Sequence, residues 1–431
     1  MKSPICEMFD IEFPMVAFSH CRDVVVAVSK AGGMGVLGAV GHTPEMLEQD
    51  LKWIDDHIDG MPYGVDLLVP NTFEGKGTNK TSEDLRDMIP QEYRDFRADV
   101  LKQYEVDGEA LRGGSEAKDV ELASDSRFGK NLKQDGAQKL LEVAFSHPIK
   151  LIANALGVPP KWMLDMGKEN NVKVAALLGA KEHAIKQVQA GVDVLVVSGT
   201  EGGGHCGSVS TMVLIPEVKR AIKDLGDVPI LAAGGIATGE QMAGIMTMGA
   251  DGVWCASVFL PTTEAETSEN IKEKMIQATS SQTVRSKSRT GKHSRQLQSA
   301  WTDAWESKDA PEPLPMPLQT IVGEPALAIV SKQATLGNEG AKKLDTYWVG
   351  QGIGLVNETI SAGQTVQKFK EEFEKKNGAD SYIAISIKDY ENLSRNFAEL
   401  RRYIEQQKQI IIYYEEATRP SESETDDRNT E

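Results

Sequence analysis

Short apolar runs alternate with amphipathic stretches along residues 14–72 and again along residues 149–262. The runs have the length of buried strands, and the stretches between them have the periodicity of surface helices. The pattern predicts eight strands, at Pro14–Ala17, Met34–Leu37, Tyr63–Leu68, Lys150–Ala155, Lys173–Leu177, Val192–Val197, Pro229–Ala233 and Gly252–Cys255. Helices are predicted between them at Arg22–Ala31, Pro44–His57, Pro159–Asn170, Ala180–Ala190, Ile215–Leu225 and Gly239–Met248.

Continuously apolar strands that are separated by helices are typical of a parallel sheet buried on both faces. Eight such repeats favour a closed TIM (β/α)₈ barrel over an open doubly wound sheet, which stays the alternative. The expected fold class is therefore α/β, with the barrel over residues 1–265.

An insertion at about residues 72–135 interrupts the alternation. It is rich in charge and glycine, and it has two helical patches, at Glu83–Met88 and Gln91–Tyr104. Because it follows the carboxyl end of a strand, where barrel active sites lie, it is either a lid-like segment or a plain surface excursion.

Residues 266–378 are expected to form a smaller helical domain that caps the substrate site and returns to the barrel. Within it, Ser268–Glu306 is expected to be helical, with the basic residues between Arg285 and Arg295 on a solvated face. The alternative for this basic cluster is a binding site for the pyrophosphate of CoA or of a pyridine nucleotide. The proline-rich segment Asp309–Pro317 predicts an extended connector, and helical patterning resumes at about Pro325 and runs to Asn377.

Residues 379–417 predict a helical extension with a heptad-like seam of Leu393, Phe397, Leu400, Ile404 and Ile411. The seam is expected to pack on its own domain, with a second subunit as the alternative, which leaves a homo-oligomer open. Residues 418–431 are acidic and nearly free of apolar side chains, so they are expected to be disordered.

Charge and cysteine content restrict the function. There are 64 acidic and 47 basic residues, which gives a formal net charge of −17. A surface of this sign repels phosphate backbones and anionic lipids, so neither nucleic acid nor a membrane is an expected partner. The cysteines are scattered and lack the spacing of zinc ligands, which predicts reduced thiols and no metal site. No apolar run has the length of a membrane span or a leader, and a cytoplasmic location is expected.

The densest chemical motif is Ser198–Gly207, directly after the sixth predicted strand. It holds three consecutive glycines followed by His205. Glycines at this place allow the backbone to approach a flat ligand closely, with the histidine beside it. The alternative is a flexible turn that carries an incidental surface histidine.

Two further motifs follow the seventh and eighth predicted strands, at Leu231–Gly239 and Trp254–Phe259. Loops at these two places commonly form the phosphate site of a TIM barrel. Gly234 and Gly235 can offer bare N–H groups to phosphate oxygens, and Ala256 and Ser257 can add further donors. The motifs therefore predict a phosphate-binding site, with two tight turns as the alternative.

Taken together, the sequence resembles the FMN-dependent nitronate monooxygenase family, also called 2-nitropropane dioxygenase-like. The matching pieces are Ala27–Gly35, Pro62–Leu68, Gly203–His205, Ala232–Ile236 and Tyr347–Gly352. Several stretches look closest to a subgroup of NADH-dependent flavin oxidoreductases that act on steroid-derived CoA thioesters: Phe18–Val25, Thr279–Arg285, Ala300–Trp305 and Pro313–Gln319. The resemblance implies a TIM barrel with non-covalent FMN and a smaller helical domain over the flavin.

The resemblance also implies roles for particular residues. His205 would be the catalytic acid/base at the flavin. The cofactor-binding residues would be Ala17, Phe18, Ser19, Asp66, Ser198, Gly203, Gly204, Gly234, Gly235, Ala256, Ser257 and Gln351. Among these, the residues at 17–19 would touch the flavin ring, and Gln351 would approach it from the second domain.

The sequence departs from the family pattern where substrate is expected. The first loop is shorter than usual, Asp66 and Ser299 stand where asparagine is common, and Ser198 stands where glutamine is common. The resemblance therefore implies an FMN oxidoreductase with two open routes, oxidation of a nitronate or NAD(P)H-dependent reduction of an enoyl- or steroid-ring-derived CoA thioester. A non-redox phosphate-binding lyase or isomerase, and a flavin-free scaffold with an oligomerising tail, are the remaining alternatives.

Overall fold

The computed structural model describes residues 3–69, 82–108, 134–155, 157–377 and 387–417. Contacts divide the chain into two compact units, Met1–Lys376 and Asn377–Glu431. The predicted barrel and most of the predicted second domain thus belong to one compact unit.

The eight predicted strands form a closed parallel barrel in the order β1-β2-β3-β4-β5-β6-β8-β9. Their bounds are β1 (Met15–Ser19), β2 (Met34–Gly38), β3 (Tyr63–Leu67), β4 (Leu151–Asn154), β5 (Lys173–Leu178), β6 (Val194–Ser198), β8 (Ile230–Ala233) and β9 (Gly252–Cys255). The barrel closes where β1 pairs with β9, with Val16 opposite Trp254. The expected TIM (β/α)₈ fold is confirmed.

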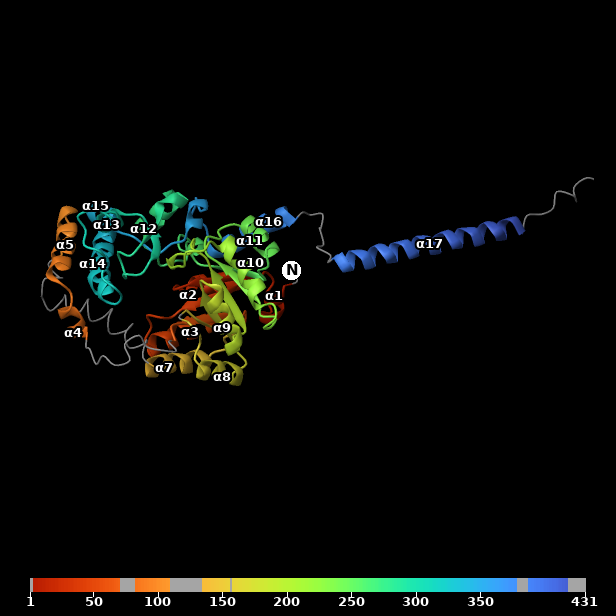
Figure 1. Cartoon of the computed structure of the whole chain (residues 1–431), viewed down its shortest axis with the longest axis horizontal. Coiled ribbons are helices and arrows are strands. Elements are labelled where there is room, and N and C mark those ends of the chain that lie inside the picture. The colour runs from red at the N-terminus through yellow and green to blue at the C-terminus, as the bar shows by residue number, and fades with distance from the viewer. Residues whose placement is uncertain (1–2, 70–81, 109–133, 156, 378–386, 418–431) are drawn as a thin grey trace, which may run out of the picture. The chain divides into compact units, whose positions relative to one another are not determined.

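Helices surround the barrel and bury their apolar faces against its strands (Figure 1). They are α2 (Arg22–Lys30), α3 (Pro44–His57), α7 (Gln134–Phe145), α8 (Lys161–Glu169), α9 (Lys181–Ala190), α10 (Thr211–Ile222) and α11 (Gly239–Thr247). The helix predicted at Ile215–Leu225 starts four residues earlier, at Thr211, so its predicted start is wrong and Pro216 lies inside the helix. The earlier start is stabilised because Thr211 N donates to the Glu201 carboxylate at 2.9 Å, which satisfies an N–H at the helix terminus.

A short helix that the sequence pattern does not predict, α1 (Pro4–Phe9), packs against the barrel interior. Its Ile5 and Phe9 form one apolar cluster with inward-facing strand residues such as Val16 and Met34. The hydroxyl of Ser3 donates to the carbonyl of Asp251, just before β9 begins. Helix α1 therefore covers the amino-terminal end of the barrel, opposite the end where a site is expected.

After the barrel, the predicted helical segment Ser268–Glu306 is wrong in its middle. The chain forms η2 (Ser257–Phe259), α12 (Glu269–Gln277), η3 (Ser280–Gln282), strands β10 (Thr283–Ser286) and β11 (Ser294–Leu297), and α13 (Ala300–Trp305). Strands β10 and β11 are antiparallel, and β11 also pairs with β7 (Gly204–His205). The segment is extended because pairing with the distant strand β7 and a turn through Gly291, at φ +77°, supply hydrogen-bond partners for its backbone N–H and C=O groups.

The rest of this unit is mainly helical, with α14 (Leu318–Thr335), α15 (Glu339–Leu344), η4 (Gln351–Leu355) and α16 (Ala362–Asn377). The predicted start at Pro325 is wrong, because α14 begins at Leu318 and holds Pro325 in its interior. The chain between α15 and α16 includes an isolated bridge from Trp348 to Gln296 of β11. That bridge ties this stretch to the small sheet.

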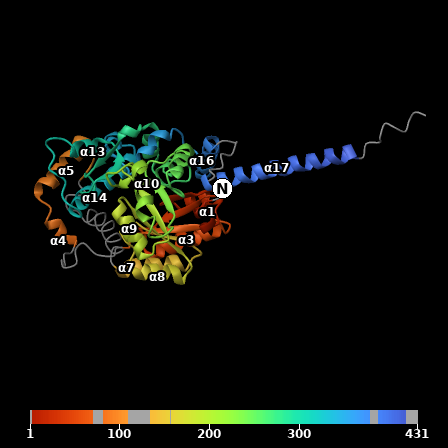
Figure 2. The same cartoon turned by 45° about the vertical axis from the view of Figure 1, so that its right-hand side comes forward.

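The described part of the insertion holds α4 (Ser82–Asp87) and α5 (Gln91–Gln103). Both helices contact α14, and α5 lies beside α13 and α14 in both views (Figures 1 and 2). Tyr93 and Leu101 share an apolar cluster with Trp301, Trp305 and Leu327. Residues 82–108 therefore contribute to a second core. The rest of the predicted lid-like insertion lies mainly in residues 70–81 and 109–133. These are outside the described residues.

The second unit holds α17 (Ile387–Ala417). Leu400, Ile404 and Ile411 of the predicted seam are exposed by 55%, 48% and 56%. Packing of the seam on its own domain or on a second subunit stays a prediction. The acidic segment 418–431 lies outside the described residues. Among the helices that the structure describes, none is long and apolar enough to cross a bilayer.

Candidate active site

A cavity of about 830 Å³ lies where the barrel strands end at their carboxyl sides. Its volume is in the range of small-molecule and cofactor sites, and its place is that of TIM-barrel active sites. Nine residues predicted for the site line it together: Phe18, Asp66, Ser198, Gly203, His205, Gly234, Gly235, Ala256 and Ser257. Residues from five barrel strands and the loops that follow them thus meet in one place.

Four other predicted site residues are not among those that line the cavity. Ala17 is fully buried in the layer between strands and helices, because neighbouring strand residues face opposite sides. The Ser19 hydroxyl accepts from Cys21 N, and Gly204 lies in β7. Gln351 donates its backbone N–H to the Glu201 carbonyl at 2.8 Å, so its backbone joins the glycine loop to η4.

Gly234 and Gly235 both adopt left-handed backbone conformations, at φ +92° and +75°. L-residues with a Cβ rarely take such conformations, so glycine is required for this turn after β8. The hydroxyl of Ser257, after β9, accepts from Gly350 N at 2.9 Å and keeps its own proton for another acceptor. The two strand ends therefore offer the backbone N–H groups and hydroxyl that were expected of a phosphate site.

The glycine loop before His205 has a structural reason as well. A Cβ on Gly203 would lie 2.8 Å from Gly350 N, because the backbone of the segment between α15 and η4 passes directly against it. A Cβ on Gly202 would meet the Ser198 hydroxyl at 2.7 Å. Close backbone approach was the predicted reason for these glycines, and at Gly203 the approaching group is the protein's own chain.

His205 lies in β7 and is fixed by the small sheet, opposite Ser294 of β11. Its Nε2 and the Thr290 hydroxyl are 2.8 Å apart, and its ring lies 6.0 Å from that of Trp348. Partial desolvation lowers the pKa of His205, and the nearby cations of Lys292 and Arg289 lower it further. The ring stays open to the cavity and is neutral at neutral pH, as a proton acceptor requires.

The surroundings of His205 are themselves held rigidly. Arg289 forms two hydrogen bonds of 2.7 Å to the Glu324 carboxylate, and its guanidinium lies 3.9 Å from the centre of the Trp348 ring. The Trp348 indole donates to the Ser294 hydroxyl at 3.2 Å. A bidentate ion pair and a stacked aromatic ring thus fix the wall next to the histidine.

Asp66, at the end of β3, is only 1% exposed although it lines the cavity. Its Oδ2 atom has no hydrogen-bond partner among the described residues. Burial raises the pKa of this carboxyl well above its ordinary value. The raised pKa favours the protonated form of Asp66, which can donate a hydrogen bond.

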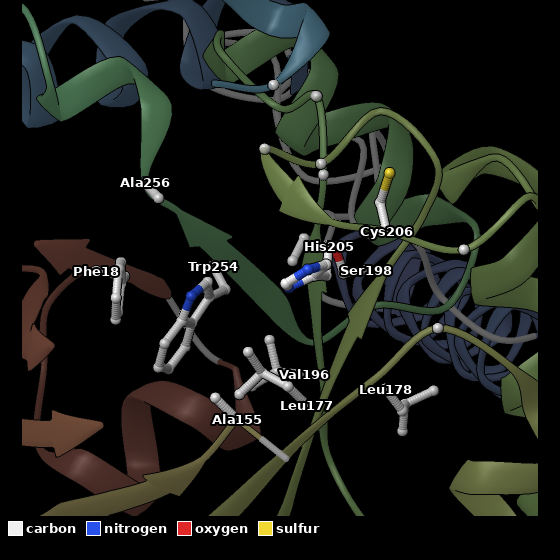
Figure 3. A pocket seen from close by; sticks show the side chains of 18 of the residues that line it. Phe18, Ala155, Leu177, Leu178, Val196, Ser198, His205, Cys206, Trp254 and Ala256 are labelled. Carbon is white, nitrogen blue, oxygen red and sulfur yellow. The ribbon is translucent and has the colours of Figure 1, made fainter. Parts of the chain in front are cut away.

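Apolar side chains make up another wall of the cavity. Phe18, Leu177, Val196 and Trp254 line it, and Figure 3 shows Trp254, Val196 and Leu177 below the His205 ring in this view. Phe18 and Trp254 are stacked, with ring centres 6.2 Å apart. Such a surface suits a flat aromatic ligand, with the polar groups of His205, Ser198 and Asp66 around it.

Sequence reasoning did not select Thr290, which bonds to His205, or His293, which lines the cavity. Arg285 and Lys292 also line the cavity, and the sequence named their basic cluster only as an alternative binding site. All four belong to the segment that was expected to be a helix with a solvated basic face. Its partner strand, β7, is about 90 residues away in sequence, so no local signal could place these residues beside His205.

Comparisons with known proteins agree with this geometry. Residues 2–372 match the nitronate monooxygenase family. A Mycobacterium tuberculosis protein named "Putative monooxygenase Rv1533" is 47% identical over 377 residues, covering 86% of this chain and 96% of that protein. A Staphylococcus saprophyticus protein named "Probable nitronate monooxygenase" is 26% identical, covering 83% of this chain and 93% of that protein.

Solved structures share the fold. A nitroalkane oxidase from Streptomyces ansochromogenes matches with a TM-score of 0.67 and 22% identity, covering 88% of this chain and 99% of that one. FabK from Thermotoga maritima matches with a TM-score of 0.62 and 22% identity, covering 87% of this chain and 97% of that one. The family match extends over most of the chain and includes the whole described cavity, so this chain is an oxidoreductase that belongs to the nitronate monooxygenase family.

Proposed function

We propose that the chain is an FMN-dependent oxidoreductase of small molecules, with His205 as the acid/base. One observation carries the proposal: a single cavity combines a glycine-rich cradle, an apolar wall and a neutral histidine. The family implies a flavin, and the cradle supports FMN in particular, because it offers N–H groups for one terminal phosphate.

The residues present fit FMN in three respects. Gly234, Gly235, Ala256 and Ser257 would hold the phosphate at the ends of β8 and β9. The apolar wall that includes Trp254 would lie against the ring system. The unpartnered Asp66 carboxyl would supply a hydrogen-bond donor to a polar edge.

When bound, FMN would supply the hydride and electron transfer of the reaction. His205 accepts the proton of a neutral substrate at its ring nitrogen, or returns a proton to a product. Thr290 fixes the orientation of the ring through the 2.8 Å contact at Nε2, which leaves Nδ1 for proton transfer. The Trp348 wall and the Arg289–Glu324 pair keep the neighbouring backbone in place.

Two reactions fit this arrangement. In the first, a nitronate is oxidised with dioxygen as co-substrate, and His205 deprotonates the neutral nitroalkane. In the second, NADH or NADPH is the electron donor for reduction of an enoyl- or steroid-ring-derived CoA thioester. His205 would take up a proton from solvent at Nδ1 and deliver it to the reduced thioester. The cations of Arg285 and Lys292 on the cavity wall support the second reaction, because both of its substrates carry phosphates.

A non-redox barrel enzyme has less support. A Schiff-base mechanism needs a lysine at the end of a barrel strand. Among the described residues that line the cavity, Lys292 is the one lysine. It follows β10 of the hairpin, so it does not stand at the end of a barrel strand.

The test is the absorption spectrum of the purified protein, followed by anaerobic mixing. We expect flavin bands in the visible range and release of FMN on heat denaturation. Bleaching by NADH or NADPH without nitronate would identify the reductase, and bleaching by a nitronate alone would identify the oxidase. A protein that is colourless and binds no added FMN would contradict the proposal.

A further inference from the structure

The hairpin of residues 283–297 places basic side chains on the wall of the cavity. It consists of β10, β11 and the turn between them, and β11 joins it to β7 beside His205. Arg285, Lys292 and His293 all line the cavity. In a chain with a net charge of −17, this is a local concentration of positive charge at a site otherwise lined mainly by neutral residues.

Two arginines face each other across the hairpin. Arg285 is the direct cross-strand partner of Arg295. Like charges at such positions destabilise a sheet, because their side chains share one face. Burial lowers the pKa of Arg295, and the charge of Arg285 contributes in the same direction. The pair therefore destabilises the sheet in the free protein, and a bound anion would remove this destabilisation.

The other cations of the hairpin are already paired within the protein. Lys287 contacts Glu312 at 3.1 Å, and Arg289 is bound by Glu324. Arg295 donates to the carbonyls of Thr200 and Thr283, at 2.9 and 2.8 Å.

Arg285 and Lys292 differ from these residues. Among the described residues, neither side chain has an ion-pair or hydrogen-bond partner, and Nε of Arg285 is buried. A buried guanidinium N–H without an acceptor is costly, and an anionic ligand in the cavity would satisfy it. Lys292 is exposed and close enough to His205 to affect its charge state.

We propose that Arg285 and Lys292 bind the diphosphate of an adenosine diphosphate-type tail, carried by a co-substrate whose reactive end reaches His205. The site is separate from the predicted FMN phosphate cradle, which lies at the ends of β8 and β9 and uses neutral N–H groups. Two cations match the two charges of a diphosphate. The inference rests on the proposed oxidoreductase function, because such tails belong to nicotinamide dinucleotides and to CoA thioesters.

The two sources can be distinguished with adenosine fragments. Calorimetric titration of the purified protein would use ADP-ribose for NADH, 2′-phospho-ADP-ribose for NADPH and adenosine 3′-phosphate 5′-diphosphate for CoA, each of which carries the 5′-diphosphate. We expect at least one fragment to bind more tightly than inorganic phosphate, and the preferred one identifies the co-substrate. Binding should weaken with added salt, because exposed charges take part.

Substitutions locate the site. Arg285→Ala and Lys292→Ala should each weaken fragment binding by roughly tenfold to a hundredfold, the loss expected for one charge-assisted hydrogen bond. Lys292→Glu should weaken it further, and this exposed position is safe for folding. The matched control is Lys287→Ala on the same hairpin, which removes a cation that pairs with Glu312 and does not line the cavity. The Lys287→Ala variant should bind the fragments as tightly as the unchanged protein does.

The inference is overturned if no fragment binds more tightly than phosphate, or if the Arg285 and Lys292 variants bind as well as the Lys287 variant. FMN content is measured separately from its visible absorption. A yellow protein that binds none of the three fragments refutes the diphosphate site alone. A colourless protein that binds one of them but takes up no added FMN refutes the proposed FMN function alone.

Discussion

Replacing the buried carboxyl by its amide, Asp66→Asn, should make the protein more stable at neutral pH. Asp66 is 1% exposed, its Oδ2 has no partner among the described residues, and burial raises its pKa. Folding at neutral pH therefore requires the carboxyl either to take up a proton or to remain charged in an apolar site. Asparagine has nearly the same shape and needs neither.

The sign and size follow from proton linkage. The unfolded chain ionises Asp66 at about pH 3.9, whereas the folded chain keeps the proton to higher pH. Between these two values the folded state binds more protons, so stability is greatest at low pH and falls as pH rises. The slope is about 1.4 kcal/mol per pH unit. The advantage of Asp66→Asn should therefore grow as pH rises above the unfolded-state pKa, by at most about 1.4 kcal/mol per pH unit, and level off once pH passes the raised folded-state pKa.

Urea unfolding of the ligand-free protein at pH 4, 5, 6, 7 and 8 measures this difference directly. The matched control is Asp227→Asn, which changes an exposed carboxyl and should give a nearly constant difference over the same range. If the free energy of unfolding of Asp66→Asn differed from that of the original protein by the same amount at every pH, the inferred neutral carboxylic acid would be wrong.

Three other substitutions test the site. His205→Ala should keep the flavin absorption and lose roughly 10²- to 10⁴-fold in turnover, whereas full activity would remove His205 from the mechanism. In the unchanged enzyme, the acid limb of the pH–rate profile should lie below about 6.5, because the lowered pKa keeps His205 neutral to lower pH. Thr290→Val removes the 2.8 Å contact and should lower kcat by roughly two- to tenfold without changing FMN affinity, and an unchanged pH–rate profile and kcat would argue against positioning. Gly234→Ala should cost roughly 1–2 kcal/mol and weaken FMN binding, because φ is +92°. Its control, Gly244→Ala, lies in α11 with open space around it and should be neutral or stabilising.

The barrel could be predicted from the sequence because its strands are buried on both faces. Val194–Val197 and Ile230–Ala233 are continuous apolar runs, and a parallel sheet between helices explains such runs. Helix α1 was missed because its six residues are too short to show a helical period. The hairpin was missed because its strands are polar and become ordered through β7, which is distant in sequence.

The site was predictable to a similar extent. Glycine and histidine after barrel strands are local signals, and His205, Gly234 and Gly235 line the cavity as expected. Arg285 reaches the same cavity, and Thr290 reaches His205, only through the pairing of β11 with β7. Neither the spacing nor the residue types around them indicate that contact.

The shared core of α5 with α13 and α14 has a consequence for biosynthesis. About 200 residues separate Leu101 from Trp301, its neighbour in that apolar cluster. At ribosomal speeds of roughly 5–20 residues per second, the apolar face of α5 leaves the ribosome roughly 10–40 s before its partners exist. During that interval the nascent chain presents Tyr93, Val100 and Leu101 to the surrounding solvent, where chaperones that bind apolar segments would protect it from aggregation.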